Sequence, residues 1–442
     1  MDRWNGVCRS ISFVVGLLLM AQSVCAQTAR PPRPYRSLFG GSKTTQQGLH
    51  ALDLTFFLDG GFDKSNQVVV VPAEGTVSPA PEFQENYSAG TLLAYTRRGR
   101  RVTADAQGTT SVPYYSMFPG QPTTLAYGAS GRLSVLSGKT TTGVTGSFFH
   151  SPYYSSVLDP SAGPGVTPGD YASALNPNNV VAAGASLTRR FRRSTSVSAG
   201  YGYDSTAFTQ DSRTNRTQGV RGSLEHQLSR RATLTGGYGY RAAEYATEGV
   251  KTVSSSNDLD AGFRYTLQRS RERTSTFAVG VGSSWVDEFD RYYQGWRWSV
   301  HGDYSLGAKW VARADYGRNL NYYAGLQQPV WSDDVYASAA GHFGPRVTLT
   351  LGATYSNGQR VSLAGRGFDT YSLPARLQVG LAQWLAVTAD YFYYRYNYPV
   401  GYDLPGGMPP RLDRQRVQIG ASFWLPVLRA GRSGGSAASA KQ

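Results

Sequence analysis

From residue 49 to residue 425 the chain alternates apolar and polar residues in long runs, and this period of two restricts its fold most. In residues 259–267 the odd positions are Leu, Ala, Phe, Tyr and Leu, and the positions between them are polar or glycine. Residues 347–355 and 417–425 repeat the pattern. Successive side chains of a β-strand point to opposite faces, so each run predicts a strand with one apolar face. Such runs are long for a soluble strand and match a tilted strand that crosses a membrane.

Two kinds of connection separate these runs. Short connections centre near Gly99, Gly138, Phe191, Arg230, Arg271, Ala308, Gly344 and Gln383. Longer connections, rich in Pro, Gly, Asp and Asn, alternate with them at 63–86, 113–123, 155–178, 209–217, 247–256, 287–293, 325–332, 357–370 and 398–412. Short turns on one side and long loops on the other are typical of outer-membrane barrels, whose periplasmic turns are short. The sequence therefore predicts an all-β fold, a transmembrane antiparallel up-and-down β-barrel of about 18 strands.

A β-propeller is the alternative all-β fold, because the short turns recur at intervals close to the length of a propeller blade. A blade contains four short strands, however, and each interval here contains two long ones. A closed ring of strands also satisfies every backbone group in lipid, which cannot hydrogen-bond the chain. Side chains alone cannot fill a barrel of about 18 strands, so we expect an aqueous lumen.

The N-terminus has the pattern of an export signal. Arg3 and Arg9 precede the apolar run 11–21, and Val24-Cys25-Ala26 offers small residues before a cut at Gln27. We expect a signal peptide at 1–26, a periplasmic segment at 27–48, the barrel at 49–425 and a C-terminal tail at 426–442. Both cysteines of the sequence lie inside the expected signal, so the mature chain has no thiol for a disulfide or a metal. The expected location is the cell outer membrane.

Positive charge gathers in the short turns, whose summed charge equals the net charge of +15 of the whole chain. The densest cluster is LTRRFRRSTS, at 187–196. We predict a basic rim on the periplasmic side that includes Arg98, Arg100, Arg189, Arg190, Arg192, Arg193, Arg230 and Arg231. Such a rim can meet the anionic head groups of the inner leaflet, or it can gather an anionic solute or dock an acidic partner.

Strand parity also predicts which charged residues line the lumen. The predicted arginines are Arg132, Arg221, Arg241, Arg264, Arg297, Arg313, Arg376 and Arg416. The predicted acids are Asp53, Asp105, Asp204, Glu225, Asp258, Asp260, Asp303, Asp315 and Asp390. The two sets are nearly equal, which disfavours a lumen of one sign. They can pair into ladders that stiffen the wall, or form a transverse field that orients a hydrated solute.

Aromatic residues mark the two ends of the predicted strands. Tyrosine doublets recur at the loop-side ends, at 114–115, 153–154, 292–293, 322–323 and 393–394. One ring of each pair should face lipid as part of an interfacial girdle, and the other should face inward. Trp310, Trp384 and Trp424 lie at the short-turn ends and predict the second girdle.

The sequence offers no catalytic or cofactor motif in a suitable context. The five histidines show no metal-ligand spacing, and His301 with Asp303 is only a weak dyad because many residues share an i, i+2 relation. Glycines near 200 and 237 belong to strands and precede no helix, so they are not phosphate loops. We therefore expect no enzyme, no cofactor and no nucleic-acid partner.

The alternating strands and the ending RVQIGASFWLPVLR resemble the β-barrel porins encoded with exopolysaccharide systems in Gram-negative bacteria. In strand number the chain also resembles the alginate exporter, although its balanced lumen departs from the arginine-rich pore of that type. The resemblance implies a passive export pore for a polysaccharide cargo, set in outer-membrane lipid and working with a periplasmic polysaccharide export protein. A general diffusion porin for small hydrophilic solutes is the alternative, and a non-conducting adhesion or scaffold barrel is a third hypothesis. An inward fold of loop 155–178 would favour a constricted pore.

Overall fold

The computed structural model describes residues 49–65, 68–70, 77–79, 83–116, 125–155, 172–174, 176–209, 212–247, 249–270, 273–288, 291–306, 309–323, 326, 328–362, 367–399, 404 and 408–430. The expected signal peptide, the segment 27–48 and the end of the tail lie outside these residues. No helix among them has the length and hydropathy needed to span a bilayer.

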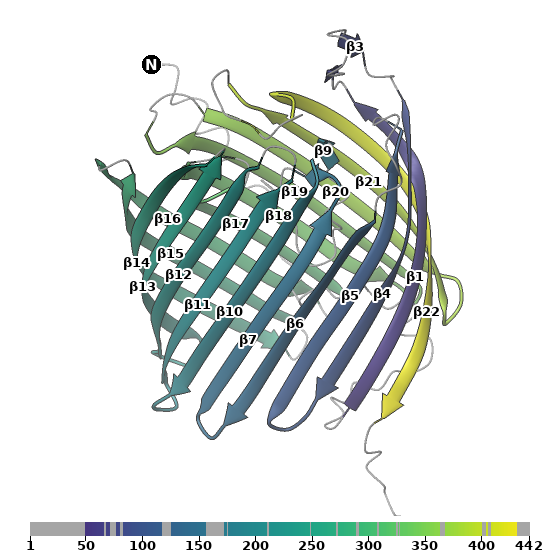
Figure 1. Ribbon diagram of the computed structural model, residues 1–442. Coiled ribbons are helices and arrows are strands. Elements are labelled where there is room, and N and C mark those ends of the chain that lie inside the picture. The colour runs from purple at the N-terminus through teal and green to yellow at the C-terminus, as the bar shows by residue number, and fades with distance from the viewer. Residues whose placement is uncertain are drawn as a thin grey trace, which may run out of the picture.

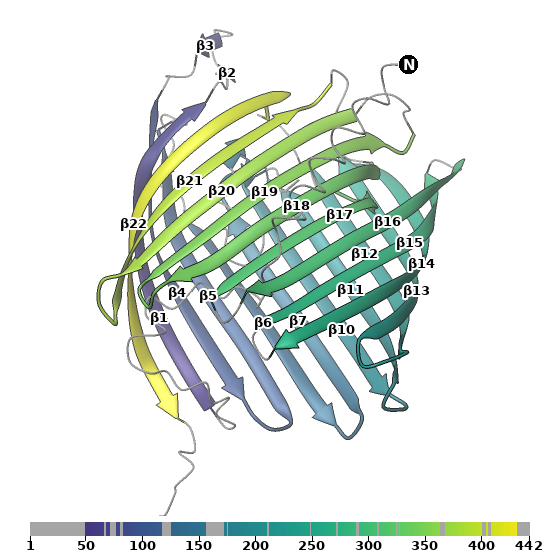
Figure 2. The ribbon, with the colours of Figure 1, turned by 180° about the vertical axis from the view of Figure 1, so that it is seen from behind.

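Eighteen of the described strands form one antiparallel sheet that closes on itself (Figures 1 and 2). They are β1 (Leu49–Ser65), β4 (Gln84–Arg98), β5 (Val102–Tyr115), β6 (Ala126–Ser137), β7 (Thr140–Ser151), β10 (Asn178–Arg190), β11 (Thr195–Phe208), β12 (Thr214–Gln227), β13 (Ala232–Thr247), β14 (Val250–Ser270), β15 (Arg273–Glu288), β16 (Arg291–Leu306), β17 (Trp310–Asn321), β18 (Val330–Phe343), β19 (Val347–Arg360), β20 (Gly367–Gly380), β21 (Leu385–Asn397) and β22 (Arg411–Ala430). Two small strand pairs form separate sheets that are not part of the ring, β2 (Val68–Val70) with β3 (Val77–Pro79) and β8 (Tyr154–Ser155) with β9 (Ala172–Ala174).

The ring closes where the first strand pairs with the last. β1 pairs with β22 on one side and with β4 on the other. β7 pairs directly with β10, although β8 and β9 come between them in the sequence. β22 continues to Ala430, past the expected end of the barrel at residue 425, and a bulge at Val427 of β22, opposite Leu52 and Asp53, interrupts this extra pairing. The predicted barrel of about 18 antiparallel strands is confirmed.

The outer wall of the barrel is apolar. Large side chains such as Phe62 (58% exposed), Val281 (65%) and Ile419 (63%) point away from the lumen, and similar residues follow every strand of the ring. An apolar surface this extensive is unfavourable in water, whereas it is favourable in contact with the acyl chains of lipid. Closed rings of strands with an apolar outer wall occur in outer membranes, and the chain is therefore an outer-membrane β-barrel.

Aromatic pairs mark the short-turn end of this wall. Trp310 contacts Phe343 edge-on at 5.0 Å between ring centroids, and Trp384 stacks on Phe423 at 5.9 Å. The prediction for Trp424 was wrong. Phe423 and Leu425 occupy the exposed outward positions of β22, so Trp424 between them has inward parity. Phe423 takes its place in the girdle.

Two of the expected long connections are tight turns. β13 ends at Thr247 and β14 begins at Val250, and β15 ends at Glu288 and β16 begins at Arg291. The polar residues expected in loops continue the strands of these hairpins instead. A strand that projects beyond the membrane needs no apolar face, so the period-two pattern fades before the pairing ends. Of loop 155–178, residues 156–171 and 175 lie outside the described part of the chain.

The length asymmetry of the connections predicts the orientation of the barrel. An epitope tag inserted at Gly249, in the exposed β13–β14 turn, should be labelled by antibody on intact cells, because this turn lies at the same end of the barrel as the long connections, which face outward in such barrels. A tag at Gly138, in the short β6–β7 turn, should be labelled only after the cells are permeabilised. Labelling in the reverse sense would show that the short turns face the exterior.

Candidate functional site

The inner wall of the barrel carries the charged residues. The alternate positions of each strand, opposite the exposed apolar side chains, point into the lumen. The structure places all seventeen of the residues predicted to line the lumen on these inward positions, namely Arg132, Arg221, Arg241, Arg264, Arg297, Arg313, Arg376, Arg416, Asp53, Asp105, Asp204, Glu225, Asp258, Asp260, Asp303, Asp315 and Asp390. Many of them make ion pairs with one another across neighbouring strands.

The largest ion-pair group spans β12 to β16. The carboxylate of Asp258, whose side chain is only 4% exposed, forms an ion pair with Arg241 at 2.9 Å and lies 3.5 Å from Arg297. Ser284 donates a short hydrogen bond to the same carboxylate. Two residues further along β14, Asp260 forms an ion pair with Arg221 at 2.6 Å. These contacts join five adjacent strands through their inward faces and hold positive and negative groups side by side.

A second group lies nearer the short turns, on β16 and β17. Nε2 of His301 is 2.6 Å from Asp303, and its Nδ1 is 2.5 Å from Asp315. Arg313 donates to the other oxygen of Asp315 at 2.6 Å. The weak His301–Asp303 pair of the sequence is thus one edge of a four-residue network. No group of His, Asp and Glu in the described residues is arranged to hold a metal ion.

Two further inward pairs are more exposed. Arg376 contacts Asp390 at 2.6 Å, and Arg264 lies 3.5 Å from Glu225. Half-exposed pairs of this kind contribute little to stability, but they place both signs of charge along the solvent-accessible wall. The described lumen wall therefore presents both signs of charge rather than one dominant sign.

The connection between β17 and β18 turns into the barrel. β17 pairs with β16 only as far as Trp298–Arg318, although β17 runs on to Asn321. Above that point the ring of Trp331, on β18, lies against Gly295 of β16 so closely that a Cβ at position 295 would overlap it. The end of β17 therefore separates from β16 while it stays paired with β18 as far as Asn321–Val330, and the residues after it are directed toward the interior.

Both tyrosines of the 322–323 doublet follow this inward path. The guanidinium of Arg241 lies 5.2 Å from the ring centre of Tyr322, and its Nη1 donates to the carbonyl of Leu320 at 3.1 Å. Arg241 belongs to β13, which is separated from β17 by three strands, so the contact passes through the interior of the ring and not along its wall. The expectation that one tyrosine of this pair faces lipid was wrong, because the connection folds inward.

Tyr323 fixes the same segment to the opposite side. Its hydroxyl accepts a hydrogen bond from Asn321 at 3.1 Å, and its ring contacts Phe368 of β20 edge-on at 6.2 Å. Burial raises the pKa of Tyr323 to about 12. The start of the connection is therefore held by the inner wall on two sides, at β13 and at β20.

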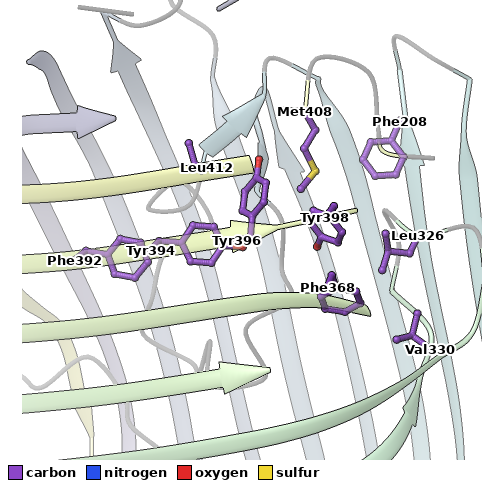
Figure 3. Close-up of a cluster of buried hydrophobic side chains, with 10 residues drawn as sticks. All are labelled: Phe208, Leu326, Val330, Phe368, Phe392, Tyr394, Tyr396, Tyr398, Met408 and Leu412. Carbon is purple, nitrogen blue, oxygen red and sulfur yellow. The ribbon is translucent and has the colours of Figure 1, made fainter. Parts of the chain in front are cut away.

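A buried aromatic cluster continues from this contact along β21 (Figure 3). Every second residue of its loop-side half points inward, and neighbouring rings touch, with centroids 5.4 to 6.0 Å apart. The buried members are Phe208, Leu326, Val330, Phe368, Phe392, Tyr394, Tyr396, Tyr398, Met408 and Leu412. The cluster gives the loop-side half of the barrel an apolar packed interior on this side.

An ion pair lies at the seam where the ring closes. Arg414 of β22 donates to Asp63 of β1 at 2.5 Å, and each side chain is 1% exposed. Arg416 lies 4.0 Å from the second oxygen of Asp63. The ring of Tyr115, on β5, faces both guanidinium groups at 5.7 and 5.8 Å. The first and last strands are thus joined by buried charge as well as by backbone hydrogen bonds.

The predicted basic rim lies in and beside the short turns. Arg100, Arg192, Arg193, Arg230 and Arg231 are exposed turn residues, and Arg189 ends the outward face of β10. Arg98 differs from the rest because it has inward parity and pairs with Asp105 at 3.0 Å. Arg190 likewise has inward parity.

Sequence reasoning located the inward charges but missed the inward connection. The segment 322–329 has the composition of the other loops, and its tyrosine doublet matches those that end ordinary strands. The one usable signal is Leu326, an apolar residue in a segment that was expected to face water.

Comparisons with known proteins show only distant similarity. No protein-family model matches the chain, and no curated protein does. Among solved structures it is similar to Acinetobacter baumannii OccAB4 (12% identity, TM-score 0.45, covering 87% of this chain and 100% of that one). It is also similar to Pseudomonas aeruginosa OprD (12%, 0.41, 87% and 98%) and to Pseudomonas aeruginosa OccK2 (OpdF) in complex with glucuronate (12%, 0.45, 87% and 100%). These similarities are low, and the conclusions below rest on the strand pairing and the side-chain contacts.

Proposed function

We propose that this protein is a passive outer-membrane channel through which small hydrophilic solutes diffuse. The observation that carries the proposal is the ring of charged inward side chains on a closed barrel of eighteen strands. A barrel of this size is too wide for its own side chains to fill, and ions and hydrated solutes are stabilised by a charged wall. The described residues supply no group that could couple transport to an energy source.

The contacts inside the loop-side half favour small solutes over a polymer. Tyr322 and Leu320 contact Arg241 across a chord of the ring, and Tyr323 is held against Phe368. These contacts reduce the cross-section that a solute can use. A polysaccharide needs a continuous wide path, so the structure supports the diffusion channel better than the expected export pore with its periplasmic partner.

Reconstitution into planar lipid bilayers tests the proposal. The purified protein should form stepwise, ohmic channels in potassium chloride, because its described lumen wall carries both signs of charge and so admits both ions. Absence of channel steps from a correctly folded sample would overturn the proposal and favour the adhesion or scaffold hypothesis. Periplasmic accumulation of polysaccharide in a deletion strain would instead favour export.

Removing one acid from the ladder should shift the ion selectivity of the channel. Asp260 pairs with Arg221, whose side chain is 50% exposed, so Asp260→Asn leaves that cation facing the lumen. We expect the anion-to-cation permeability ratio to rise by about twofold. Reversal potentials in a potassium chloride gradient measure this ratio.

The matched control is Glu244→Gln. Glu244 lies on β13 and forms an ion pair with Lys251 of β14 at 3.0 Å, but it has outward parity. Its substitution should leave the reversal potential unchanged. An equal shift in both variants would mean that the ladder does not face the conducting path.

A further inference from the structure

Three hairpin turns at the short-turn end share one backbone geometry. In each, the first residue donates its N–H to the carbonyl four residues later, from Phe191 to Thr195 at 3.0 Å, from Leu228 to Ala232 at 2.9 Å and from Leu381 to Leu385 at 3.0 Å. The next residue donates to the same carbonyl in all three turns. Equivalent positions in these turns therefore occupy equivalent places relative to the wall.

The first residue of each turn is apolar and faces outward. Phe191, Leu228 and Leu381 are 54%, 56% and 54% exposed, and each continues the outward face of the strand before it. They extend the lipid-facing wall past the last strand residue. The lipid surface therefore reaches the level of the turns themselves.

Arginines follow directly in two of these turns. Arg192 and Arg193 come after Phe191, and Arg230 and Arg231 come two and three residues after Leu228. All four are exposed, and none has an acidic partner among the described residues. The guanidinium of Arg189 lies 5.4 Å from the ring centre of Phe191, so cationic and apolar groups share the same outward side.

We propose that these turns bind the phosphates of anionic phospholipid head groups in the adjacent leaflet. An apolar residue inserted among acyl chains places the arginines beside it at the depth of the phosphates, and guanidinium groups match phosphate oxygens well. A basic residue near an anionic membrane surface strengthens binding several-fold. A soluble acidic protein would also meet these arginines, but it would leave the exposed Phe191 and Leu228 unexplained.

Lipid retention by the full-length protein tests this proposal. The protein is reconstituted in nanodiscs of equal parts phosphatidylglycerol and phosphatidylcholine, extracted into mild detergent and analysed for bound lipid by native mass spectrometry. We expect the wild type to retain phosphatidylglycerol over phosphatidylcholine by about tenfold. The preference should weaken at high salt, because the head groups are solvent-accessible.

The turn variant combines Arg192→Gln, Arg193→Gln, Arg230→Gln and Arg231→Gln. Its control removes four cations from the opposite end of the barrel, at Arg216, Lys251, Arg291 and Arg411, and so has the same net charge. The turn variant should lose the preference, and the control should keep it. Heat-modifiable mobility on gels verifies that both barrels are folded.

Three results would overturn the proposal. They are equal retention of the two lipids by the wild type, an undiminished preference in the turn variant, and an equal loss in both variants, which would reflect net charge alone. The first two would leave the arginines available to an acidic protein partner. As a separate check, Phe191→Gln with Leu228→Gln should also weaken retention although it removes no charge.

Discussion

Replacing Asp63 with asparagine should destabilise the barrel by about 3–5 kcal/mol, the usual effect of removing one partner of a buried ion pair. Asp63 and Arg414 are each 1% exposed, and their side chains meet at 2.5 Å between the first and last strands. The substitution leaves the Arg414 guanidinium buried opposite a neutral amide. Urea-induced unfolding in phospholipid vesicles, followed by tryptophan fluorescence, measures the change.

Two variants separate the buried charge from the loss of a contact. Asp63→Asn with Arg414→Gln removes both charges of this pair and should recover part of the lost stability, the remainder being the loss at Arg416, which still lies beside residue 63. Glu225→Gln breaks the half-exposed pair with Arg264 and should change the free energy of unfolding by only about 0–1 kcal/mol. If Asp63→Asn has no larger effect than Glu225→Gln, the seam pair does not stabilise closure of the ring.

The second large effect should come from the inward connection. Substituting alanine for Tyr322, Tyr323 and Leu326 together removes the groups that hold this segment against Arg241 and Phe368. We expect the single-channel conductance to rise by about twofold, because a wider path presents less resistance to hydrated ions. Planar-bilayer recordings before and after the substitution measure the change.

The matched control substitutes alanine for Tyr371 and Tyr391, which are 41% exposed on the outward faces of β20 and β21. These rings lie on the same part of the wall but face lipid, so the conductance should stay at the wild-type value. An unchanged conductance in the triple variant would show that the connection does not limit the conducting path, and the argument for small solutes would fail with it.

Much of the wall could be predicted because a strand encodes its two faces locally. Asp258 and Asp260 lie at even positions beside the apolar Leu259 and Ala261, and this is enough to direct both carboxylates inward once the odd face meets lipid. The positions of the short turns followed from the same pattern. Trp424 shows that residue type alone is a weaker predictor than strand parity. Its aromatic ring suggested a place in the lipid-facing girdle, but its even position on β22 directs it inward.

The sequence by itself determined the ring of strands and the side of the wall on which each charge lies, because both depend on a period of two within one strand. Only the tertiary structure decided that the end of β17 separates from β16, that Tyr322 reaches Arg241 across the lumen, and that Asp63 meets Arg414 at the seam. Such contacts join residues far apart in the chain, 351 positions in the case of the seam pair. No local pattern encodes them, because they form only when the closed ring sets the distance and direction between its strands.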